Sequence, residues 1–323
     1  MDLKSMTLQE MQEYMESIGE KKFRAKQIYE WLHVKLVDHF DGVKPVDCFI
    51  SKIDGTRKYL FELYDGNIIE SVLMKYKHGN SVCISSQAGC RMGCKFCAST
   101  LGGLDRNLTP SEMLSQIYYI QRDTEERVSN VVMMGTGEPM DNYDNVLRFL
   151  ELITSEDRLN ISQRNITIST CGIVPKIKEL AQKHLQITLA ISLHSPNDEM
   201  RRGLMPIAMK YSIDELLDAC HYYFKETNRR MTFEYSLVAG VNDQPVHAEE
   251  LAGRLKGFPC HVNLIPVNPI KERDFKQSMP KSVMEFKKIL EKNRVNVTIR
   301  REMGADINAA CGQLRRKKLQ SRL

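Results

Sequence analysis

Three cysteines in one short segment are the residues of this sequence best suited to chemistry. The segment 90–97 reads CRMGCKFC and places Cys90, Cys94 and Cys97 at the spacing C-x3-C-x2-C. Three thiolates can bind three irons of a [4Fe-4S] cluster, for which four cysteine ligands are the usual rule. The fourth iron then has no protein ligand, and an open metal position is typical of a catalytic site. The spacing therefore predicts a [4Fe-4S] cluster that can bind a small molecule.

A zinc site is the alternative for these cysteines, because two thiolates at this spacing also suit zinc. A structural zinc needs four ligands, and the next Cys or His after the segment is Cys171. The sequence has no second C-x2-C pair that would complete such a site. The available ligands therefore favour the cluster over zinc.

The composition is that of a globular protein with one large domain and a small appendage. The chain has 323 residues, of which 42% are hydrophobic and 27% charged. Its nine cysteines, without a secretory signal, predict a cytoplasmic protein with reduced thiols rather than structural disulfides. No apolar run approaches the length of a membrane span, so we expect no membrane contact. We also expect a monomer, although no sequence pattern specifies the oligomeric state.

Positive charge is concentrated at the C-terminus. The formal net charge is +5, and the last nine residues contain five basic side chains and no acidic one: Arg315, Arg316, Lys317, Lys318 and Arg322. Such a basic run often contacts nucleic-acid phosphates, but a solvated chain end has the same composition. A basic group near the N-terminus is open to the same two interpretations: Lys21, Lys22, Arg24 and Lys26.

Strands and helices alternate from residue 80 onward, which indicates a parallel sheet with crossover helices. We expect strands near residues 81–86, 130–134, 165–169, 186–193, 231–237, 261–265 and 295–299. Helices are expected from Thr109, near residues 143–152, 174–184 and 246–255, and after caps at Ser212 with Glu215 and Ser282 with Glu285. Six such units predict an α/β fold, an incomplete (β/α)6 barrel, whose chemistry collects at the C-terminal ends of the strands.

The first 80 residues are predicted to be helical and then hairpin-like. Residues 1–40 read as two helices, the first opened by a capping box at Thr7 and the second spanning about residues 24–39. Asp65 and Gly66 are expected to turn a β-hairpin, in which Glu70 points to solvent. The hairpin strands are residues 59–63 and 68–74, after a connector at 41–55. The predicted regions are a helical accessory domain, 1–50, a connector and hairpin, 51–79, the barrel, 80–302, and a C-terminal loop with a basic tail, 303–323.

Polar residues follow the predicted strands, at the edge where a barrel binds its ligands. They are Gly137 and Glu138 after the second strand, Ser169 after the third, Ser192, Leu193 and His194 after the fourth, and Asn268 after the sixth. Glycines let the backbone approach a ligand, and a carboxylate accepts hydrogen bonds from an ammonium group. A Gly-rich turn and a lone structural histidine are the plainer interpretations of Gly137 and His194. Their shared position at one rim favours a ligand-binding role.

The cysteine segment resembles the signature of the radical S-adenosylmethionine (SAM) superfamily. The sequence GTGEP at residues 135–139 resembles the element of that superfamily that holds the methionine amine. The resemblance implies that the amino and carboxylate groups of SAM chelate the open iron, and that an electron from the cluster cleaves SAM to a 5′-deoxyadenosyl radical. It also implies the barrel fold and a SAM-binding role for the rim residues.

Three further segments resemble one family in that superfamily, the radical SAM rRNA adenine methyltransferases. They are CISSQAGC at residues 83–90, ISLHSPND at 191–198 and DINAACGQL at 306–314. In that family one SAM methylates a cysteine, here Cys311, and a second SAM forms the radical that takes hydrogen from the S-methyl group. The methylene radical adds to the base and leaves a protein–RNA crosslink. The resemblance assigns removal of the ring proton to Glu70, and release of the product through a transient disulfide with Cys311 to Cys83.

The family has two branches, which methylate carbon 2 or carbon 8 of an adenine. Gly137, Glu138 and Pro139 resemble the carbon-2 branch, which acts on 23S rRNA and tRNA; the carbon-8 branch, which gives antibiotic resistance, is the alternative. The implied partners are these RNAs, bound by the basic ends of the chain, and an electron donor such as flavodoxin. The segment between Phe40 and Ser51 is shorter than is usual in the family, so the RNA-binding mode of the N-terminal region stays open.

Two other classes of protein are also considered. A methylthiotransferase would need further clustered cysteines, whereas the remaining ones are isolated and read as structural: Cys48, Cys171, Cys220 and Cys260. By its own pattern Cys83 is a buried strand cysteine, which is usually inert. A non-catalytic RNA-binding protein would contain zinc and no iron.

Overall fold

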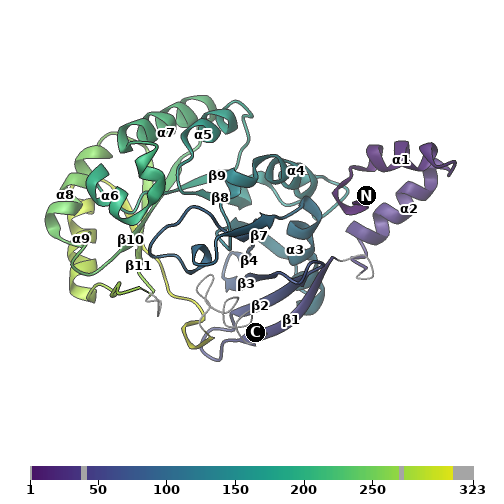
Figure 1. The fold of residues 1–323 in the computed structure, drawn as a ribbon, viewed down its shortest axis with the longest axis horizontal. Helices are drawn as coiled ribbons and strands as arrows, with labels where there is room; N and C mark the ends of the chain where they lie inside the picture. The colour runs from purple at the N-terminus through teal and green to yellow at the C-terminus, as the bar shows by residue number, and fades with distance from the viewer. Residues whose placement is uncertain (1, 38–41, 269–272, 308–323) are drawn as a thin grey trace.

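One curved sheet runs through most of the molecule (Figure 1). The computed structural model describes residues 2–37, 42–268 and 273–307. Within them, ten strands form the sheet in the order β1-β2-β3-β4-β7-β8-β9-β10-β11-β12. The strands from β1 to β4 pair antiparallel, and those from β4 to β12 pair parallel. The predicted parallel barrel is confirmed, and an antiparallel extension continues its sheet at one edge.

The strand bounds follow the predicted ones closely in the barrel. The antiparallel part comprises β1 (Val43–Ile50), β2 (Arg57–Leu63), β3 (Ile68–Tyr76) and β4 (Gly79–Cys83). The parallel part continues with β7 (Val128–Met133), β8 (Ile166–Thr170), β9 (Thr188–Ser192), β10 (Met231–Leu237), β11 (Cys260–Pro266) and β12 (Asn296–Ile299). A separate small sheet joins β5 (Gln87–Gly89) and β6 (Leu104–Asn107). The predicted hairpin is confirmed, with Leu60 of β2 opposite Glu70 of β3.

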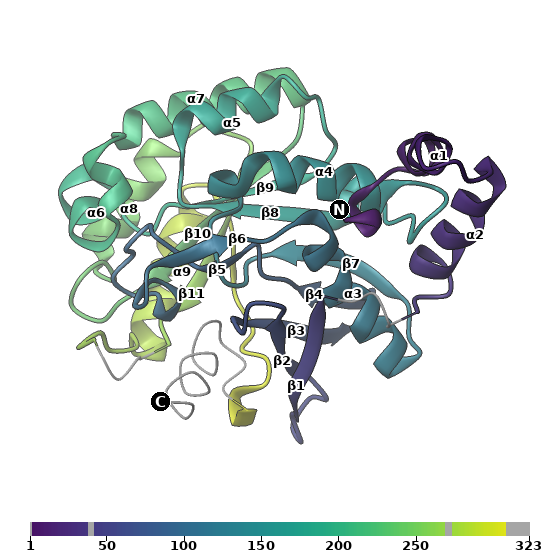
Figure 2. The ribbon, with the colours of Figure 1, turned by 45° about the vertical axis from the view of Figure 1, so that its right-hand side comes forward.

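Helices follow the parallel strands and lie on the outer side of the curved sheet (Figure 1, Figure 2). They are α3 (Pro110–Thr124), α4 (Tyr143–Thr154), α5 (Val174–Ala181), α6 (Asp198–Leu204), α7 (Ile213–Thr227), α8 (Pro245–Arg254) and α9 (Pro280–Lys292). Capping boxes open α3 at Thr109 and α7 at Ser212, as predicted. Each parallel strand of the large sheet from β4 to β11 is therefore followed by at least one helix before the next strand of that sheet, which is the predicted series of six β/α units.

The two faces of the parallel strands differ in polarity. In β8, Ile166 and Ile168 are fully buried in the main core, whereas Thr167 and Ser169 are only partly buried. Side chains alternate between the two faces of a strand, so the polar pair points to the inside of the curve. Because apolar side chains do not fill this inner face, it leaves room for a ligand.

Two helices form a small unit at one end of the molecule (Figure 1). They are α1 (Leu8–Ser17), which begins at the predicted capping box of Thr7, and α2 (Lys22–His33). Helix α2 ends earlier than the predicted residue 39, because Leu36 adopts a left-handed φ of 51°. The unit has an apolar core of its own: Met11, Met15, Ala25, Tyr29 and Leu32. Among the described residues, no helix combines the length and the apolar character that a membrane crossing requires.

Two further predictions about element boundaries are wrong. Residues 41–55, predicted to be a connector, contain β1, which pairs with β2. A proline in an alternating run argues against a central strand, and Pro45 is tolerated here because β1 lies at the sheet edge and has an irregularity between Pro45 and Asp47. Helix α9 begins at Pro280 rather than after a cap at Ser282. Proline already has a helical φ, so it starts a helix without a side-chain cap.

Candidate functional site

A cavity of about 500 Å³ opens at the C-terminal ends of the parallel strands. Its volume is that of a site for a nucleotide-sized ligand. Ten of the predicted site residues line it: Cys83, Cys90, Cys94, Cys97, Gly137, Glu138, Ser169, Ser192, His194 and Asn268. Glu70 and Leu193 are not among the lining residues, and Cys311 lies outside the described residues.

The three predicted cluster ligands lie on the loop between β5 and β6. These strands pair antiparallel, and the N–H of Cys90 donates a hydrogen bond of 2.7 Å to the carbonyl of Gly103, which closes the base of the loop. A side chain at Gly89, where φ is +82°, would come within 2.1 Å of that same carbonyl oxygen. Only glycine permits this closure. The loop is therefore held in a shape that presents all three thiols to the cavity.

The three thiols influence one another electrostatically. Burial raises the pKa of Cys90 to about 12, and Cys97 adds to this rise. Burial also raises the pKa of Cys94, and both neighbouring thiols act in the same direction. Thiols of this kind ionise readily only when a cation binds them.

A single metal ion and a cluster place different demands on the described side chains. No three His, Cys, Asp or Glu side chains in the described part of the chain converge closely enough to hold one metal ion. A zinc ion would require its thiolates to meet at one centre, whereas in a [4Fe-4S] cluster each cysteine binds a different iron. The described side chains therefore form no single-ion site, and the cluster stays a prediction from the sequence.

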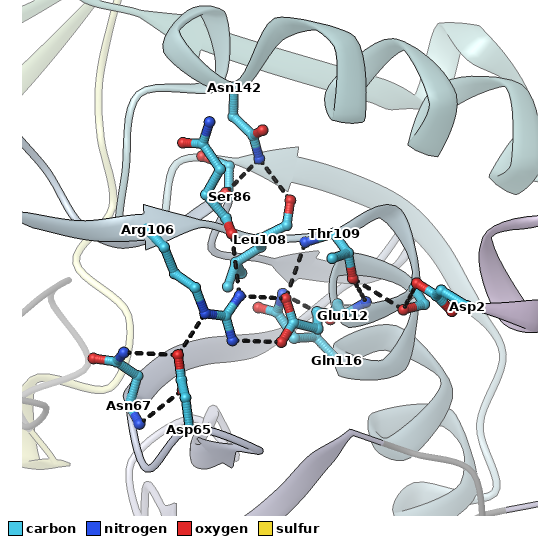
Figure 3. A network of polar contacts seen from close by, with 12 residues as sticks. Asp2, Asp65, Asn67, Ser86, Arg106, Leu108, Thr109, Glu112, Gln116 and Asn142 are labelled. Atoms are coloured by element: carbon cyan, nitrogen blue, oxygen red, sulfur yellow. Dashed lines mark hydrogen bonds and ion pairs between the residues drawn. The ribbon is translucent and has the colours of Figure 1, made fainter.

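A polar network attaches the cysteine loop to the elements around it (Figure 3). Arg106, on β6, donates to both carboxylate oxygens of Glu112 at 2.7 and 2.8 Å. It also pairs with Asp65 in the turn between β2 and β3. Because Glu112 caps the start of α3, Arg106 joins the loop to a helix and to the hairpin at the same time.

Two amide side chains join the segments on either side of the cysteine loop. Asn142 donates hydrogen bonds to the carbonyls of Ser86 and Leu108, each at 2.8 Å (Figure 3). Gln87 accepts a hydrogen bond of 2.8 Å from the N–H of Glu138. The loop after β7 is thereby fixed to the strand that leads into the cysteines.

The glycines after β7 have a packing role that was not predicted. A side chain at Gly135 would come within 2.6 Å of the carbonyl oxygen of Ile84, and one at Gly137 within 2.7 Å of the backbone nitrogen of Gln87. Gly137 also has a φ of +113°, which disfavours any side chain. The glycines therefore allow two segments of the protein, and not only a ligand, to approach closely.

Glu138 is buried and joins two of the loops at the cavity. Its carboxylate accepts hydrogen bonds from the N–H of Cys171 at 2.7 Å and of Met140 at 3.0 Å. Burial raises the pKa of this carboxyl, and the hydrogen bond from Cys171 opposes the rise. Each carboxylate oxygen has a second lone pair, so the group retains acceptor capacity toward an ammonium group of a ligand.

His194 is a neutral ring at the cavity wall. It lies edge-to-face with Phe96 of the cysteine loop, with ring centroids 4.6 Å apart. Its Nδ1 accepts a hydrogen bond of 2.9 Å from the backbone N–H of Ser236, so the ring proton is on Nε2. Burial lowers the pKa of His194 to about 3, and Arg201 acts in the same direction. With a left-handed φ of 58°, this residue has a strained backbone of the kind found at functional sites.

Glu70 is buried on β3, so the prediction that it points to solvent is wrong. The Nζ of Lys58, fully buried on β2, lies 3.0 Å from its Oε2. A counter-charge makes burial of a carboxylate tolerable, and this one comes from a neighbouring strand that the pattern of β3 cannot reveal. Glu70 shares a face of β3 with Val72, which lines the cavity and pairs with Cys83 of β4.

The segment that precedes Cys311 in sequence lies at the same cavity. Residues 300–305 contribute to its lining. The carboxylate of Asp306 accepts a hydrogen bond of 2.7 Å from Ser51, in the turn after β1. Ile307, the last described residue, packs against the apolar group that contains Cys83.

Two buried polar residues near the cavity were missed. Glu234, on β10, lines the cavity and accepts a hydrogen bond of 2.8 Å from Asn263, while burial raises its pKa. A carboxylate inside the apolar strand MTFEYSL was an available signal.

Arg201, on α6, donates to the carbonyl of Leu193 at 3.2 Å, and Leu193 itself is buried in the core. Helix α6 was not predicted, so the sequence pattern gave no indication that Arg201 lies near the cavity.

The N-terminal region and the barrel of this chain each match a known protein family. Residues 84–252 match the radical SAM superfamily, and residues 1–46 match the N-terminal domain of ribosomal RNA large subunit methyltransferases. A probable dual-specificity RNA methyltransferase RlmN from Lachnoclostridium phytofermentans is 61% identical, over 98% of this chain and 94% of its own length. The protein of the same description from Lachnospira eligens is 62% identical, over 98% and 96%.

A solved structure agrees over nearly the whole chain. The crystal structure of a radical SAM methyltransferase from Sphaerobacter thermophilus superposes with a TM-score of 0.92 at 40% identity. The match covers 97% of this chain and 98% of the other. The likeness therefore includes the N-terminal unit and the hairpin as well as the barrel.

Proposed function

The chain belongs to the RlmN family of radical SAM methyltransferases, and on this basis we propose that it methylates carbon 2 of an adenine in 23S rRNA and in tRNA. The observation that carries the proposal is that Cys83 and the three cysteines of the open-iron loop line one cavity. The description shared by its relatives favours this branch over methylation of carbon 8. The enzyme is a transferase that uses a [4Fe-4S] cluster and two molecules of SAM per turnover, as its family does.

The cavity residues suit these cofactors by their chemistry. Cys90, Cys94 and Cys97 would each hold one iron, and SAM supplies both the methyl group and the radical. Polar groups on the cavity walls would bind the amino, carboxylate, ribose and adenine parts of SAM: Glu138, Ser169, Ser192, His194 and Asn268. Carbon 2 of adenine is electron-poor and is not a nucleophile, so direct transfer of a methyl cation to it fails. A radical route is therefore required.

Cys311 is the residue that would carry the methyl group to the base. Ile307 packs in the apolar group around Cys83, and the four residues from Ile307 to Cys311 span at most about 14 Å. Cys311 is therefore within chain reach of Cys83. After the base is attached through a methylene bridge, the thiolate of Cys83 would attack the sulfur of Cys311. Once the unpaired electron of the adduct has returned to the oxidised cluster, an S–S bond would form, the bond from sulfur to the methylene carbon would break, and protonation of that carbon would give the methyl product.

Glu70 would accept the proton that leaves carbon 2 of the base. Its carboxylate is buried on the face of the sheet that also presents Val72 and Cys83, and Lys58 supplies the adjacent positive charge. A general base must reach its proton within hydrogen-bonding distance. The base would therefore enter beside β3, between Glu70 and the cysteine loop.

The RNA would have to present its adenine out of the stacked helix, as base-modifying enzymes require. Basic residues at the two ends of the chain are suited to the phosphates around it. We further propose a cytoplasmic monomer that receives electrons from a flavodoxin-like donor. The cytoplasmic location is proposed because the RNA substrates are found there. The flavodoxin-like donor is proposed because the cluster must be reduced by one electron at a time.

Anaerobic reconstitution with iron and sulfide, followed by incubation with SAM carrying a labelled methyl group and with RNA, tests the proposal. We expect a methyl group on the peptide that contains Cys311, and 2-methyladenosine in the hydrolysed RNA. The Cys311→Ala variant should give neither. A product of 8-methyladenosine would assign the enzyme to the other branch, and methylated RNA from Cys311→Ala would overturn the mechanism. A colourless protein that contains zinc and no iron would overturn the assignment of the cysteine loop.

A further inference from the structure

Arg201 is a buried positive charge without a carboxylate partner. It is fully buried on α6 and is the largest of the fully buried side chains among the described residues. Its Nη2 donates to the carbonyls of Cys171 at 2.7 Å and Ser192 at 3.3 Å, and its Nε donates to that of Leu193. Its Nη1 has no hydrogen-bond partner, and none of the described carboxylates forms an ion pair with it, although the charge of Asp198 acts on it electrostatically. A buried charge is normally paired, so this one requires an explanation.

The guanidinium lies behind the cysteine loop. Cys171, whose carbonyl it binds, belongs to the same apolar group as Cys94. The end of α6 also contacts the loop directly, because the carbonyl of Leu204 accepts a hydrogen bond of 2.9 Å from the N–H of Lys95. The positive charge of Arg201 is therefore held, through Cys171 and through α6, next to the loop that carries the predicted cluster ligands.

The predicted iron–sulfur cluster would supply the negative charge that balances the buried guanidinium of Arg201. A [4Fe-4S] cluster bound by three thiolates is an anion, and one-electron reduction adds a further negative charge. A fixed positive charge in the protein interior stabilises the more negative state most. Net charge and hydrogen bonding around such clusters set their reduction potentials.

We propose that Arg201 is the counter-charge of the iron–sulfur cluster and that it raises the cluster's reduction potential. It does not line the cavity, so it would act on the reaction only through its charge on the cluster and not by contact with a substrate. The inference rests on the cluster ligands named under the proposed function. The plainer alternative is that Arg201 only clamps the carbonyls at the ends of β8 and β9.

Three variants distinguish an effect of the positive charge of Arg201 from an effect of its hydrogen bonds to main-chain carbonyls. Arg201→Met removes both the charge and the hydrogen bonds, Arg201→Gln removes the charge but keeps a donor, and Arg201→Lys keeps the charge on a shorter side chain. Arg158→Met is the matched control. Arg158 is also a buried arginine that donates to main-chain carbonyls, those of Lys4 and Met6, but it lies at the junction with the N-terminal unit.

Each protein is reconstituted anaerobically, its iron and sulfide are quantified, and the cluster is titrated with dithionite in the presence of redox mediators. The reduced cluster is followed by electron paramagnetic resonance, without SAM or RNA. For Arg201→Met and Arg201→Gln we expect at least a tenfold lower ratio of reduced to oxidised cluster at a fixed potential. This corresponds to a negative shift of at least about 59 mV for a one-electron couple. Arg201→Lys should show a smaller negative shift, and Arg158→Met none.

Wild-type potentials in fully loaded Arg201→Met and Arg201→Gln would overturn the proposal and leave the clamp as the role of Arg201. If the neutral variants do not fold, a folded Arg201→Lys protein whose potential falls by about 59 mV or more, although its charge is retained, would also contradict it. A wild-type protein that binds no iron would instead overturn the proposed function, so the two failures are distinguishable.

Discussion

The ion pair with Lys58 allows the carboxylate of Glu70 to be buried in the protein interior. Both are buried, and their charged atoms lie 3.0 Å apart. Removal of either partner leaves a charge in the protein interior without its counter-charge, which is far more costly than the loss of a surface pair. The position of Glu70 therefore depends on a residue that takes no part in the proposed reaction.

Replacing Lys58 with Met should reduce the free energy of unfolding by about 3 kcal/mol, because Glu70 stays buried without its ion pair. The double variant Lys58→Met/Glu70→Gln should lose less than the sum of the single variants. Urea unfolding measures all three, with Lys176→Met as the control for the exposed pair with Glu179. Strict additivity would show that the pair contributes no coupling energy.

The proposed roles of the two reactive cysteines predict different end points. Cys83→Ala should accumulate RNA joined covalently to the protein, because the crosslink forms but no thiolate releases it. Cys311→Ala should form no crosslink. Labelled RNA on a denaturing gel separates these outcomes, and Cys220→Ala, which removes a buried thiol of α7 away from the cavity, is the control. Normal product release by Cys83→Ala would remove this cysteine from the mechanism.

Elements whose signals are local could be predicted from the sequence, and those that depend on distant partners could not. The capping boxes at Thr7, Thr109 and Ser212 were predicted correctly, because all their parts lie within four residues. Strand β1 was missed because Pro45 is acceptable only at the edge of a sheet. The cysteines could be predicted from their spacing and the rim residues from their positions after the strands, although Leu193 is buried in the core and does not line the cavity. The burial of Glu70 and the placement of Arg201 depend on partners from other elements.

The loop after β7 should tolerate no side chain at Gly137. In Gly137→Ala the new methyl group would lie 2.7 Å from the backbone of Gln87, at a φ that disfavours alanine. We expect a loss of about 2 kcal/mol in stability and poorer retention of iron, because this loop supports the cysteine segment. The control is Gly102→Ala, since a methyl group there meets no atom within 4 Å. Thermal unfolding and iron content test both, and equal behaviour of the two variants would contradict the packing argument.

The N-terminal unit and the barrel meet at a buried polar junction. Lys4, His33, Tyr118 and Arg158 are all buried there, with His33 Nδ1 2.9 Å from the hydroxyl of Tyr118. Burial lowers the pKa of His33 to about 2, and the positive charges of Arg158 and Lys4 act in the same direction. The imidazole is therefore neutral in the folded molecule, and its other nitrogen, Nε2, has no partner among the described residues.

This junction predicts a pH dependence of stability. Below the ordinary pKa of 6.5, the unfolded chain protonates His33 while the folded one does not. Stability should therefore fall as the pH falls below about 6.5, by up to about 1.4 kcal/mol per pH unit from this group. Trp31, the only tryptophan, lies in α2 and reports on the N-terminal unit by fluorescence. His33→Gln should lose less stability between pH 7.5 and 5.5 than the wild type and than the surface control His184→Gln. Parallel losses in all three would contradict the assignment.

The spacing along β3 has a consequence for how this enzyme can change over evolution. Glu70 reaches the face of Cys83 because an even number of steps separates it from Val72, the residue opposite that cysteine. A one-residue insertion between Glu70 and Val72 would shift the register on one side of the insertion and would turn Glu70 to the opposite face of the sheet. Variants of this enzyme that keep Glu70 on the face of Cys83 are therefore expected to change the length of β3 here by even numbers of residues.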